Sequence, residues 1–243
     1  MAQAPIAPET QTIYQSPDFQ LFAEANNWKR YWSDNISAYI KGRVVEIGAG
    51  LGVSTEYMVK PGCPEWICLE PDPSFAAHLA RRIDQGEWPR CCSAKCGVLT
   101  DLAANVMADT ILYIDVLEHI EDDEGEMRAA ASHLNREGHV IVLSPAFNFL
   151  YSQFDRAVGH HRRYNKADIE RLTPPDLALK TVFCLDSIFF FASLANRLLL
   201  KSSMPTSAQI AVWDRVLVPL SRYTDGLFGS MFGKTIVAVW RKV

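Results

Sequence analysis

The sequence has no uninterrupted apolar run that reaches membrane-spanning length, for which about 20 residues are needed. Its N-terminus also lacks a basic region followed by an apolar core, so it does not indicate an export signal. Basic residues are too few to create a general positive field, since the net charge is −4 and the isoelectric point about 5.9. We therefore expect a cytoplasmic protein that does not insert stably into a membrane and does not bind nucleic acid.

The sequence also has little that indicates a metal centre or a disulfide framework. Its six cysteines include Cys91, Cys92 and Cys96, but zinc sites usually show paired cysteine units or histidines at matching spacing. Reduced thiols on and around a buried strand explain these cysteines in a chain without an export signal. We predict no metal site and no disulfide bonds.

Short apolar runs alternate with amphipathic stretches along the 243 residues, which favours a single α/β domain. Right-handed crossovers between parallel strands place helices on both faces of such a sheet. The prediction is a Rossmann-like, doubly wound sheet of seven mostly parallel strands. Strands are expected near residues 44–47, 65–70, 90–96, 109–114, 140–143, 179–185 and 235–240.

The most informative segment is a buried strand that opens into three alternating glycines, Gly48-Ala49-Gly50-Leu51-Gly52. Glycines allow a sharp turn and let a ligand approach the main chain. The dinucleotide fingerprint G-x-G-x-x-G fails here, because Val53 stands at its third glycine. Glu46, two places before the turn, disfavours phosphate and favours a ligand with an ammonium or sulfonium charge. A cationic nucleotide derivative is therefore the expected ligand.

This turn resembles motif I of the class I S-adenosylmethionine-dependent methyltransferases. The resemblance implies that the last strand, near residues 235–240, runs antiparallel to the others. Glu70 ends the next strand, 24 positions after Glu46, where a carboxylate can accept both ribose hydroxyls. The segment Leu69-Glu70-Pro71-Asp72 resembles motif II, and Asp115-Val116-Leu117-Glu118-His119-Ile120 matches the family's motif after the fourth strand. The resemblance implies S-adenosyl-L-methionine as cofactor, S-adenosyl-L-homocysteine as product, and cofactor contacts at Glu46, Gly48, Ala49, Gly50, Gly52, Glu70, Pro71, Gly97, Val98, Leu99, Asp115 and Val116.

A loop rich in titratable and aromatic residues follows the fifth strand and ends in Gly159-His160-His161-Arg162-Arg163-Tyr164. Loops of this composition at the functional edge of a sheet usually carry specificity. The loop resembles a small-molecule subgroup, similar to methyltransferase types 11 and 12, and the resemblance spans roughly residues 28–185. We take His160, His119 and Tyr164 as candidate catalytic residues, and Tyr14, Tyr31, Tyr151, Arg162 and Arg163 as candidate substrate contacts.

His160 is the main hypothesis for a general base, since imidazole titrates near neutral pH and can accept a proton from a substrate hydroxyl or amine. Two structural alternatives stay open. The loop could only pin a lid to the acidic helix start near Asp122 and Asp123, and Glu118-His119 could be a helix-capping pair.

Residues 1–40 are expected to form an N-terminal helical lid, and residues 41–243 a methyltransferase domain with a helical insertion at about 187–230. The region 188–220 is strongly apolar or amphipathic. Core packing, a cover over the site, contact with a lipid-like substrate and a homodimer interface are all compatible with it.

The sequence thus predicts an enzyme that moves a methyl group to an O, N or C nucleophile of a small molecule, such as a natural product or a lipid-like or sugar-derived acceptor. The cofactor carries the activated methyl, and the protein positions the nucleophile. Two alternatives are a non-catalytic cofactor-binding or partner-activating subunit and an NAD(P)-dependent oxidoreductase. Val53 argues against the oxidoreductase.

Overall fold

The computed structural model describes residues 24–199, 206–227 and 231–243, and Tyr14 lies outside them. Within this part a single seven-stranded sheet has the strand order β3-β2-β1-β4-β5-β7-β6. Strand β7 runs antiparallel to β5 and β6, while β1 to β5 pair in parallel, so the predicted fold class is confirmed. The strands are β1 Arg43–Ile47, β2 Glu65–Glu70, β3 Cys92–Cys96, β4 Ala108–Ile114, β5 Leu134–Pro145, β6 Leu177–Leu185 and β7 Thr235–Lys242.

The helices begin where the sequence supplies caps. Asp72 accepts hydrogen bonds from the N–H groups of Ser74 and Phe75 at the start of α5, and Asn165 caps α8 in the same way. Helix α4 is a single turn, because the backbone is already extended at Val59. The α-helices are α3 Asn26–Ile36, α4 Thr55–Met58, α5 Pro73–Asp84, α6 Asp123–Ser132, α7 Gln153–Ala157, α8 Lys166–Arg171, α9 Ser187–Leu199, α10 Ser207–Val212 and α11 Val218–Leu227, with a π-helical segment η5 Trp213–Leu217 between the last two.

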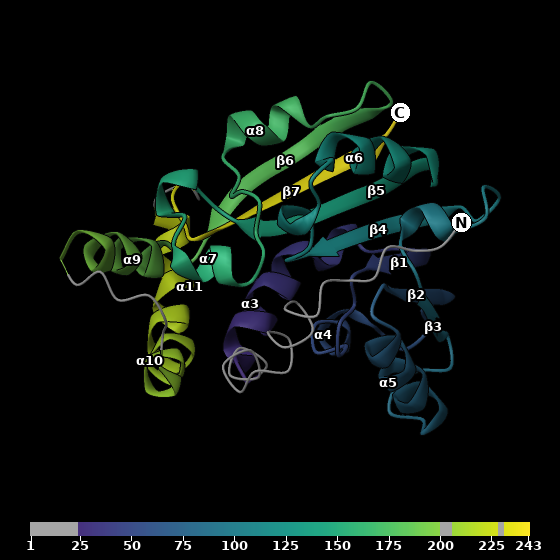
Figure 1. The fold of residues 1–243 in the computed structure, drawn as a ribbon, viewed down its shortest axis with the longest axis horizontal. Helices are drawn as coiled ribbons and strands as arrows, with labels where there is room; N and C mark the ends of the chain where they lie inside the picture. The colour runs from purple at the N-terminus through teal and green to yellow at the C-terminus, as the bar shows by residue number, and fades with distance from the viewer. Residues whose placement is uncertain (1–23, 200–205, 228–230) are drawn as a thin grey trace.

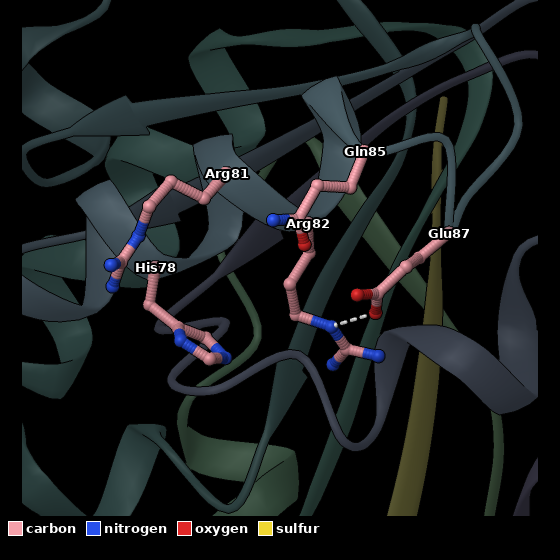
Figure 2. A pocket seen from close by; sticks show the side chains of 5 residues that line it. All are labelled: His78, Arg81, Arg82, Gln85 and Glu87. Atoms are coloured by element: carbon pink, nitrogen blue, oxygen red, sulfur yellow. Dashed lines mark hydrogen bonds and ion pairs between the residues drawn. The ribbon is translucent and has the colours of Figure 1, made fainter.

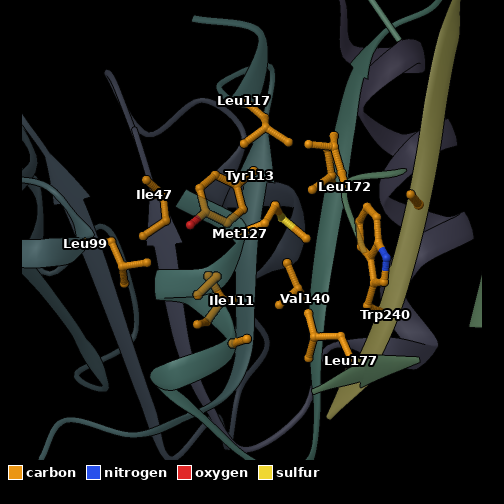
Figure 3. Packing of buried hydrophobic residues seen from close by; sticks show 14 of the residues in the cluster. Ile47, Leu99, Ile111, Tyr113, Leu117, Met127, Val140, Leu172, Leu177 and Trp240 are labelled. Atoms are coloured by element: carbon orange, nitrogen blue, oxygen red, sulfur yellow. The ribbon is translucent and has the colours of Figure 1, made fainter. Parts of the chain in front are cut away.

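Alternate residues of the central strands face opposite sides of the sheet, and each side is buried. On one side Ile111, Tyr113 and Val140 pack with Met127 of α6 (Figure 3). On the other side Leu112 belongs to a second cluster that includes residues of α3, α5 and α10. The sheet is therefore covered on both faces, as a doubly wound fold requires.

Helices α9, α10 and α11 lie at one end of the molecule, near the end of β6 and the start of β7, and α3 lies nearer the middle (Figure 1). Helix α3 contacts α11 and η5. Asp214 of η5 accepts hydrogen bonds from the backbone N–H groups of Asn27 and Trp28, so it caps α3 from the insertion. Asp225 of α11 accepts one from the Tyr31 hydroxyl at 2.7 Å. The N-terminal helix and the insertion are thus joined by buried carboxylates. No helix in the described ranges is both long and apolar enough to cross a membrane.

Candidate functional site

The carboxyl ends of β1, β2, β4 and β5 lie at one edge of the sheet, because these strands are parallel. Strands β2 and β3 lie on one side of β1, whereas β4 and β5 lie on its other side, so the chain changes direction across the sheet between β1 and β4. Ligands of open α/β sheets bind in the crevice at such a reversal. The glycine turn after β1 and the Asp115 segment after β4 flank this point, so two of the predicted motifs are neighbours in the fold.

The three glycines of the turn have different surroundings. Gly50 has a φ of +58° and no atom within 4 Å of the position that a Cβ would occupy. A Cβ on Gly48 would stand 2.7 Å from Val116 Cγ2, so this glycine lets the two loops touch. A Cβ on Gly52 would stand 2.1 Å from the Trp88 ring, so the packing of Trp88 requires a glycine here. Open space next to the main chain therefore lies at Gly50, and a cofactor contact of Gly52 remains a prediction.

Glu70 lies directly beside this open space. Its Oε2 accepts a hydrogen bond from the Gly50 N–H at 2.8 Å, and its Oε1 accepts one from the Asp72 N–H at 2.9 Å. Burial raises the pKa of the Glu70 carboxyl from its usual value. Each carboxylate oxygen has two lone pairs, so both can accept a further hydrogen bond from a ligand. The turn and Glu70 form a cradle, and the contact of Glu70 with a ribose remains a prediction.

Glu46 faces away from this cradle. Alternation along β1 turns its side chain to the sheet face of α3, where it is 1% exposed. Its Oε2 accepts hydrogen bonds from Thr55 Oγ1 at 2.8 Å and Trp66 Nε1 at 2.9 Å. The carboxyl thus fastens the start of α4 and strand β2 to β1. Direct contact between Glu46 and a cofactor finds no support in these contacts and remains a prediction.

Gly97, Val98 and Leu99, three further predicted cofactor contacts, also differ in their surroundings. Gly97 has a φ of +144°, and its N–H donates to the Glu70 carbonyl at 3.0 Å. Val98 is 42% exposed and can line a ligand site, whereas Leu99 is fully buried in the core with Ile47 and Tyr113. The prediction for the Leu99 side chain is therefore corrected.

Asp115 has a φ of +54°, an unusual conformation for a residue other than glycine. Its N–H donates to the Leu143 carbonyl at 2.8 Å, which ties the loop after β4 to β5. The residue is exposed to solvent, so its carboxyl is accessible to a ligand. Ala49 and Pro71, the remaining predicted cofactor contacts, adjoin Gly50 and Glu70 in the chain.

Across the crevice, Asp155 organises the loop after β5. Its carboxylate accepts hydrogen bonds from Arg163 Nε and Nη2 at 2.8 and 2.9 Å, and from His160 Nδ1 at 2.9 Å. The backbone and hydroxyl of Ser152 donate to the same group at 2.8 Å. These donors hold the pKa of Asp155 well below its usual value despite burial. His160 is therefore held in one orientation.

Glu118 and His119 lie next to His160. Glu118 is fully buried, and its Oε2 accepts a hydrogen bond from Ser144 Oγ at 2.7 Å. Its Oε1 is 4.0 Å from His160 Nε2, and the rings of His119 and His160 are 4.6 Å apart. Burial, together with His160, lowers the pKa of His119 to about 4. The cap of α6 is Asp122, which accepts from the Gly125 N–H, so Glu118 and His119 are not a capping pair.

Arg162 and Tyr164 serve the loop itself. Arg162 Nη1 lies 2.6 Å from Asp123 Oδ2, and its Nη2 donates to the Glu121 carbonyl. Tyr164 is fully buried, and its hydroxyl lies 3.0 Å from Asp123 Oδ2 and 3.2 Å from the Leu117 carbonyl. Burial raises the pKa of Tyr164 above its usual value. The alternative in which the loop is pinned to the acidic helix start holds for both residues, so a catalytic role for Tyr164 is not carried further.

The other predicted substrate contacts that the structure describes are also bonded within the protein. The edge of the Arg163 guanidinium formed by Nε and Nη2 faces Asp155, and its Nη1 donates to the Ala146 carbonyl. The Tyr31 hydroxyl donates to Asp225, and the Tyr151 hydroxyl donates to the His160 carbonyl at 2.6 Å. Tyr31 and Arg163 are buried, and these bonds give both residues structural roles. Substrate contacts of Tyr31, Arg162 and Arg163 find no support in these contacts and remain predictions. Tyr151 remains beside His160 and can still face an acceptor.

Sequence reasoning missed an aromatic group beside this loop. Phe147 has a φ of +63°, and its ring centroid lies 5.4 Å from both Phe149 and Phe190. Phe149 and Phe191 are 50% and 46% exposed. The sequence signal that could have identified this aromatic group is the position of Phe147 and Phe149 immediately after the fifth strand, at the edge of the sheet where ligands bind.

A separate pocket lies on α5 and the turn that follows it, lined by His78, Arg81, Arg82, Gln85 and Glu87 (Figure 2). Arg82 Nε donates to Glu87 Oε2 at 2.6 Å across it. None of these residues belongs to the predicted site. Their charges are paired in part with one another, and we assign the pocket no role in binding the cofactor.

Comparison with known proteins gives a consistent result. A methyltransferase domain model matches residues 22–180. The [4+2]-cyclase SpnF is similar in structure, with a TM-score of 0.64, 12% identity and coverage of 100% of this chain and 99% of that one. Geranyl diphosphate methyltransferase in complex with S-adenosylmethionine gives a TM-score of 0.64 at 10% identity, covering 96% and 95%.

A sarcosine dimethylglycine methyltransferase described as putative, from Galdieria sulphuraria, gives a TM-score of 0.60 at 16% identity, covering 89% of this chain and 85% of that one. A search of curated proteins found no match. At these identities the solved structures establish the fold, and the domain model establishes the family.

Proposed function

The chain belongs to the class I S-adenosylmethionine-dependent methyltransferases, and we propose on this basis that it methylates an O, N or C nucleophile of a small molecule. The observation that carries the proposal is the cradle formed by Gly50 and Glu70 next to the polar loop of His160. S-adenosylmethionine, when bound, supplies a methyl group activated by its sulfonium. The residues of the chain hold this ligand, exclude water and orient the acceptor.

The cofactor side is supported by the shape and the acceptors of the cradle. Gly50 leaves room for close approach of a ligand to the main chain, and Glu70 offers two oxygens toward a ribose. Asp115 and Val98, both open to solvent, would line the same crevice. Positioning of this kind supplies about 7 to 11 kcal/mol of barrier reduction in favourable cases.

The acceptor side is supported by the residues that face it. His160, Tyr151 and the exposed ring of Phe149 come from the loop after β5. An aromatic ring next to polar groups suits a small acceptor with an apolar body and one reactive heteroatom or carbon. The net charge of −4 disfavours a nucleic acid in this place. The cytoplasmic location and the homodimer through residues 188–220 remain predictions.

Binding of the cofactor product tests the first half of this proposal. Calorimetry should detect binding of S-adenosylhomocysteine to the protein and no binding of NAD. Gly50→Ala should abolish or strongly weaken this binding, because the new methyl group enters the open cradle at a φ of +58°. Gly62→Ala is the matched control, since Gly62 also has a positive φ of +87° and open space but lies in the turn before β2.

Both alanine variants carry the same kind of backbone strain, about 1 to 2 kcal/mol. Equal loss of ligand binding in the two variants, with equal loss of stability, would refute the cradle. A screen of small-molecule acceptors with cofactor labelled in its methyl group tests the second half. Cofactor binding without transfer to any acceptor would favour the partner-activating subunit instead.

A further inference from the structure

Three side chains of the kinds that bind transition metals meet at the carboxyl ends of β4 and β5. They are the carboxylate of Glu118 and the imidazoles of His119 and His160, and one ligand atom from each lies within 4.8 Å of the others. Glu118 and His119 belong to the short helix after β4, whereas His160 comes from the loop that follows α7. The fold therefore brings together residues about 40 positions apart in the sequence.

One atom in this cluster lacks a partner. Glu118 is fully buried, and its Oε1 has no hydrogen-bond donor, while its Oε2 accepts from Ser144. Leaving a buried polar atom unpaired costs about 1 to 3 kcal/mol, and more for a charged group. Oε1 is directed to the same space as His160 Nε2, at a separation of 4.0 Å. A cation between these two atoms would satisfy both.

The surroundings of His160 resemble those of a metal ligand. Its Nδ1–H donates to Asp155 Oδ1 at 2.9 Å, which leaves the lone pair of Nε2 facing Glu118. Asp155 is held in turn by Arg163. Histidines that bind metals commonly donate their second ring N–H to a carboxylate, which fixes the tautomer and the ring orientation. The hydrogen bonds from His160 and Arg163 to Asp155 thus orient the His160 ring through contacts within the protein alone.

We propose that Glu118, His119 and His160 form a binding site for a divalent first-row transition cation, with Zn²⁺ as the best match to two imidazoles and one carboxylate. Tetrahedral Zn²⁺ at about 2.0 to 2.1 Å from each ligand atom would place those atoms about 3.3 Å apart. The ligand atoms now lie within 4.8 Å of one another, so binding requires them to approach one another by up to about 1.5 Å. Three protein ligands leave a fourth position open.

The role of this cation toward the acceptor rests on the proposed function, whereas the binding site does not. At the open position the cation would coordinate the acceptor's heteroatom and lower its pKa. The sequence-based hypothesis of His160 as a general base is the competing interpretation, because a metal bound to Nε2 occupies the lone pair that would accept the proton. The two interpretations therefore exclude each other at this atom.

The test is a titration of the chelator-treated full-length chain with Zn²⁺ by calorimetry and with Co²⁺ by visible absorption. We expect one ion per chain and the absorption spectrum of four-coordinate Co²⁺ without a thiolate charge-transfer band. His160→Gln and Glu118→Gln should each weaken binding by about 10- to 100-fold or more. His161→Gln is the matched control, because His161 is the exposed neighbour of His160 and lies outside the cluster.

S-adenosylhomocysteine binding is measured on each variant and shows that it is folded. If Glu118→Gln fails to fold, His160→Gln alone decides the outcome. Absence of stoichiometric binding in the unmodified chain, equal affinity in His160→Gln and His161→Gln, or a thiolate band from the cysteines would overturn the site. Loss of cofactor binding with metal binding retained would instead count against the proposed function.

Discussion

Replacing Glu46 by Gln should stabilise the protein above pH 7 and remove a pH dependence of its stability. Burial raises the pKa of the Glu46 carboxyl to about 7 from an ordinary value near 4.5. Between these two values the folded chain keeps a proton that the unfolded chain has lost. The unfolding free energy of the natural chain therefore falls as pH rises from about 4.5 to about 7.

The magnitude follows from the difference between the two pKa values. A difference of about 2.5 units at about 1.4 kcal/mol per unit gives about 3 kcal/mol that is present below pH 4.5 and lost above pH 7. Gln has no such titration. Its side-chain oxygen can accept the same hydrogen bonds from Thr55 and Trp66, so the exchange preserves the contacts of β1 with α4 and β2.

Urea unfolding at pH 5 and pH 8 measures this effect directly. Glu65→Gln is the control, because Glu65 is a partly exposed glutamate on the adjacent strand that pairs with Arg43, and such pairs contribute about 0 to 1 kcal/mol. Equal destabilisation of Glu46→Gln at both pH values would show that the buried carboxylate is ionised and needed as an ion, and would refute the reasoning. An unchanged ratio of S-adenosylmethionine to S-adenosylhomocysteine affinity would further separate Glu46 from the sulfonium.

Three further outcomes are expected. Glu70→Gln should weaken S-adenosylhomocysteine binding by about 10-fold in calorimetry, since one ribose acceptor becomes a donor, a loss of about 1.4 kcal/mol; unchanged affinity would remove Glu70 from the site. Arg162→Gln should lower the unfolding free energy by about 1 kcal/mol and leave cofactor binding intact, because Arg162 pins the loop to Asp123; a selective loss of acceptor binding would restore it as a substrate contact. If the exposed residues Val216 and Leu220 form a dimer interface, light scattering should show a dimer that Leu220→Glu converts to monomer, and a natural chain that is already monomeric would contradict this.

The fold could be predicted in detail because its signals are local. The strand expected at residues 65–70 is β2 with the same bounds, and the carboxylate that ends it does reach Gly50 of the neighbouring turn. Period-two burial, glycine conformations and helix caps depend on a few adjacent residues. The parallel order of the strands then places the loops after β1, β2, β4 and β5 at one edge without any further information from the sequence.

The site was harder to predict, because a motif does not tell which way each side chain points. Gly52 and Leu99 stand in the expected motifs but face Trp88 and the core. Tyr31 was expected at the substrate, yet its hydroxyl is bonded to Asp225, 194 residues away. Such partners come from distant parts of the chain, and no local pattern predicts them.

In the polar loop after β5, the residues that stabilise the loop differ from those that are positioned to bind a ligand. Arg163 and Tyr164, which the sequence makes conspicuous, direct their polar groups to Asp155, Asp123 and the main chain. The buried atom without a donor belongs instead to Glu118, which the sequence offered as a capping residue. Because an unpaired buried carboxylate oxygen costs free energy in the isolated chain, a bound group that pairs with it recovers that cost. Arg163 thus holds His160 in place through Asp155, and the proposed ligand position lies between His160 and Glu118.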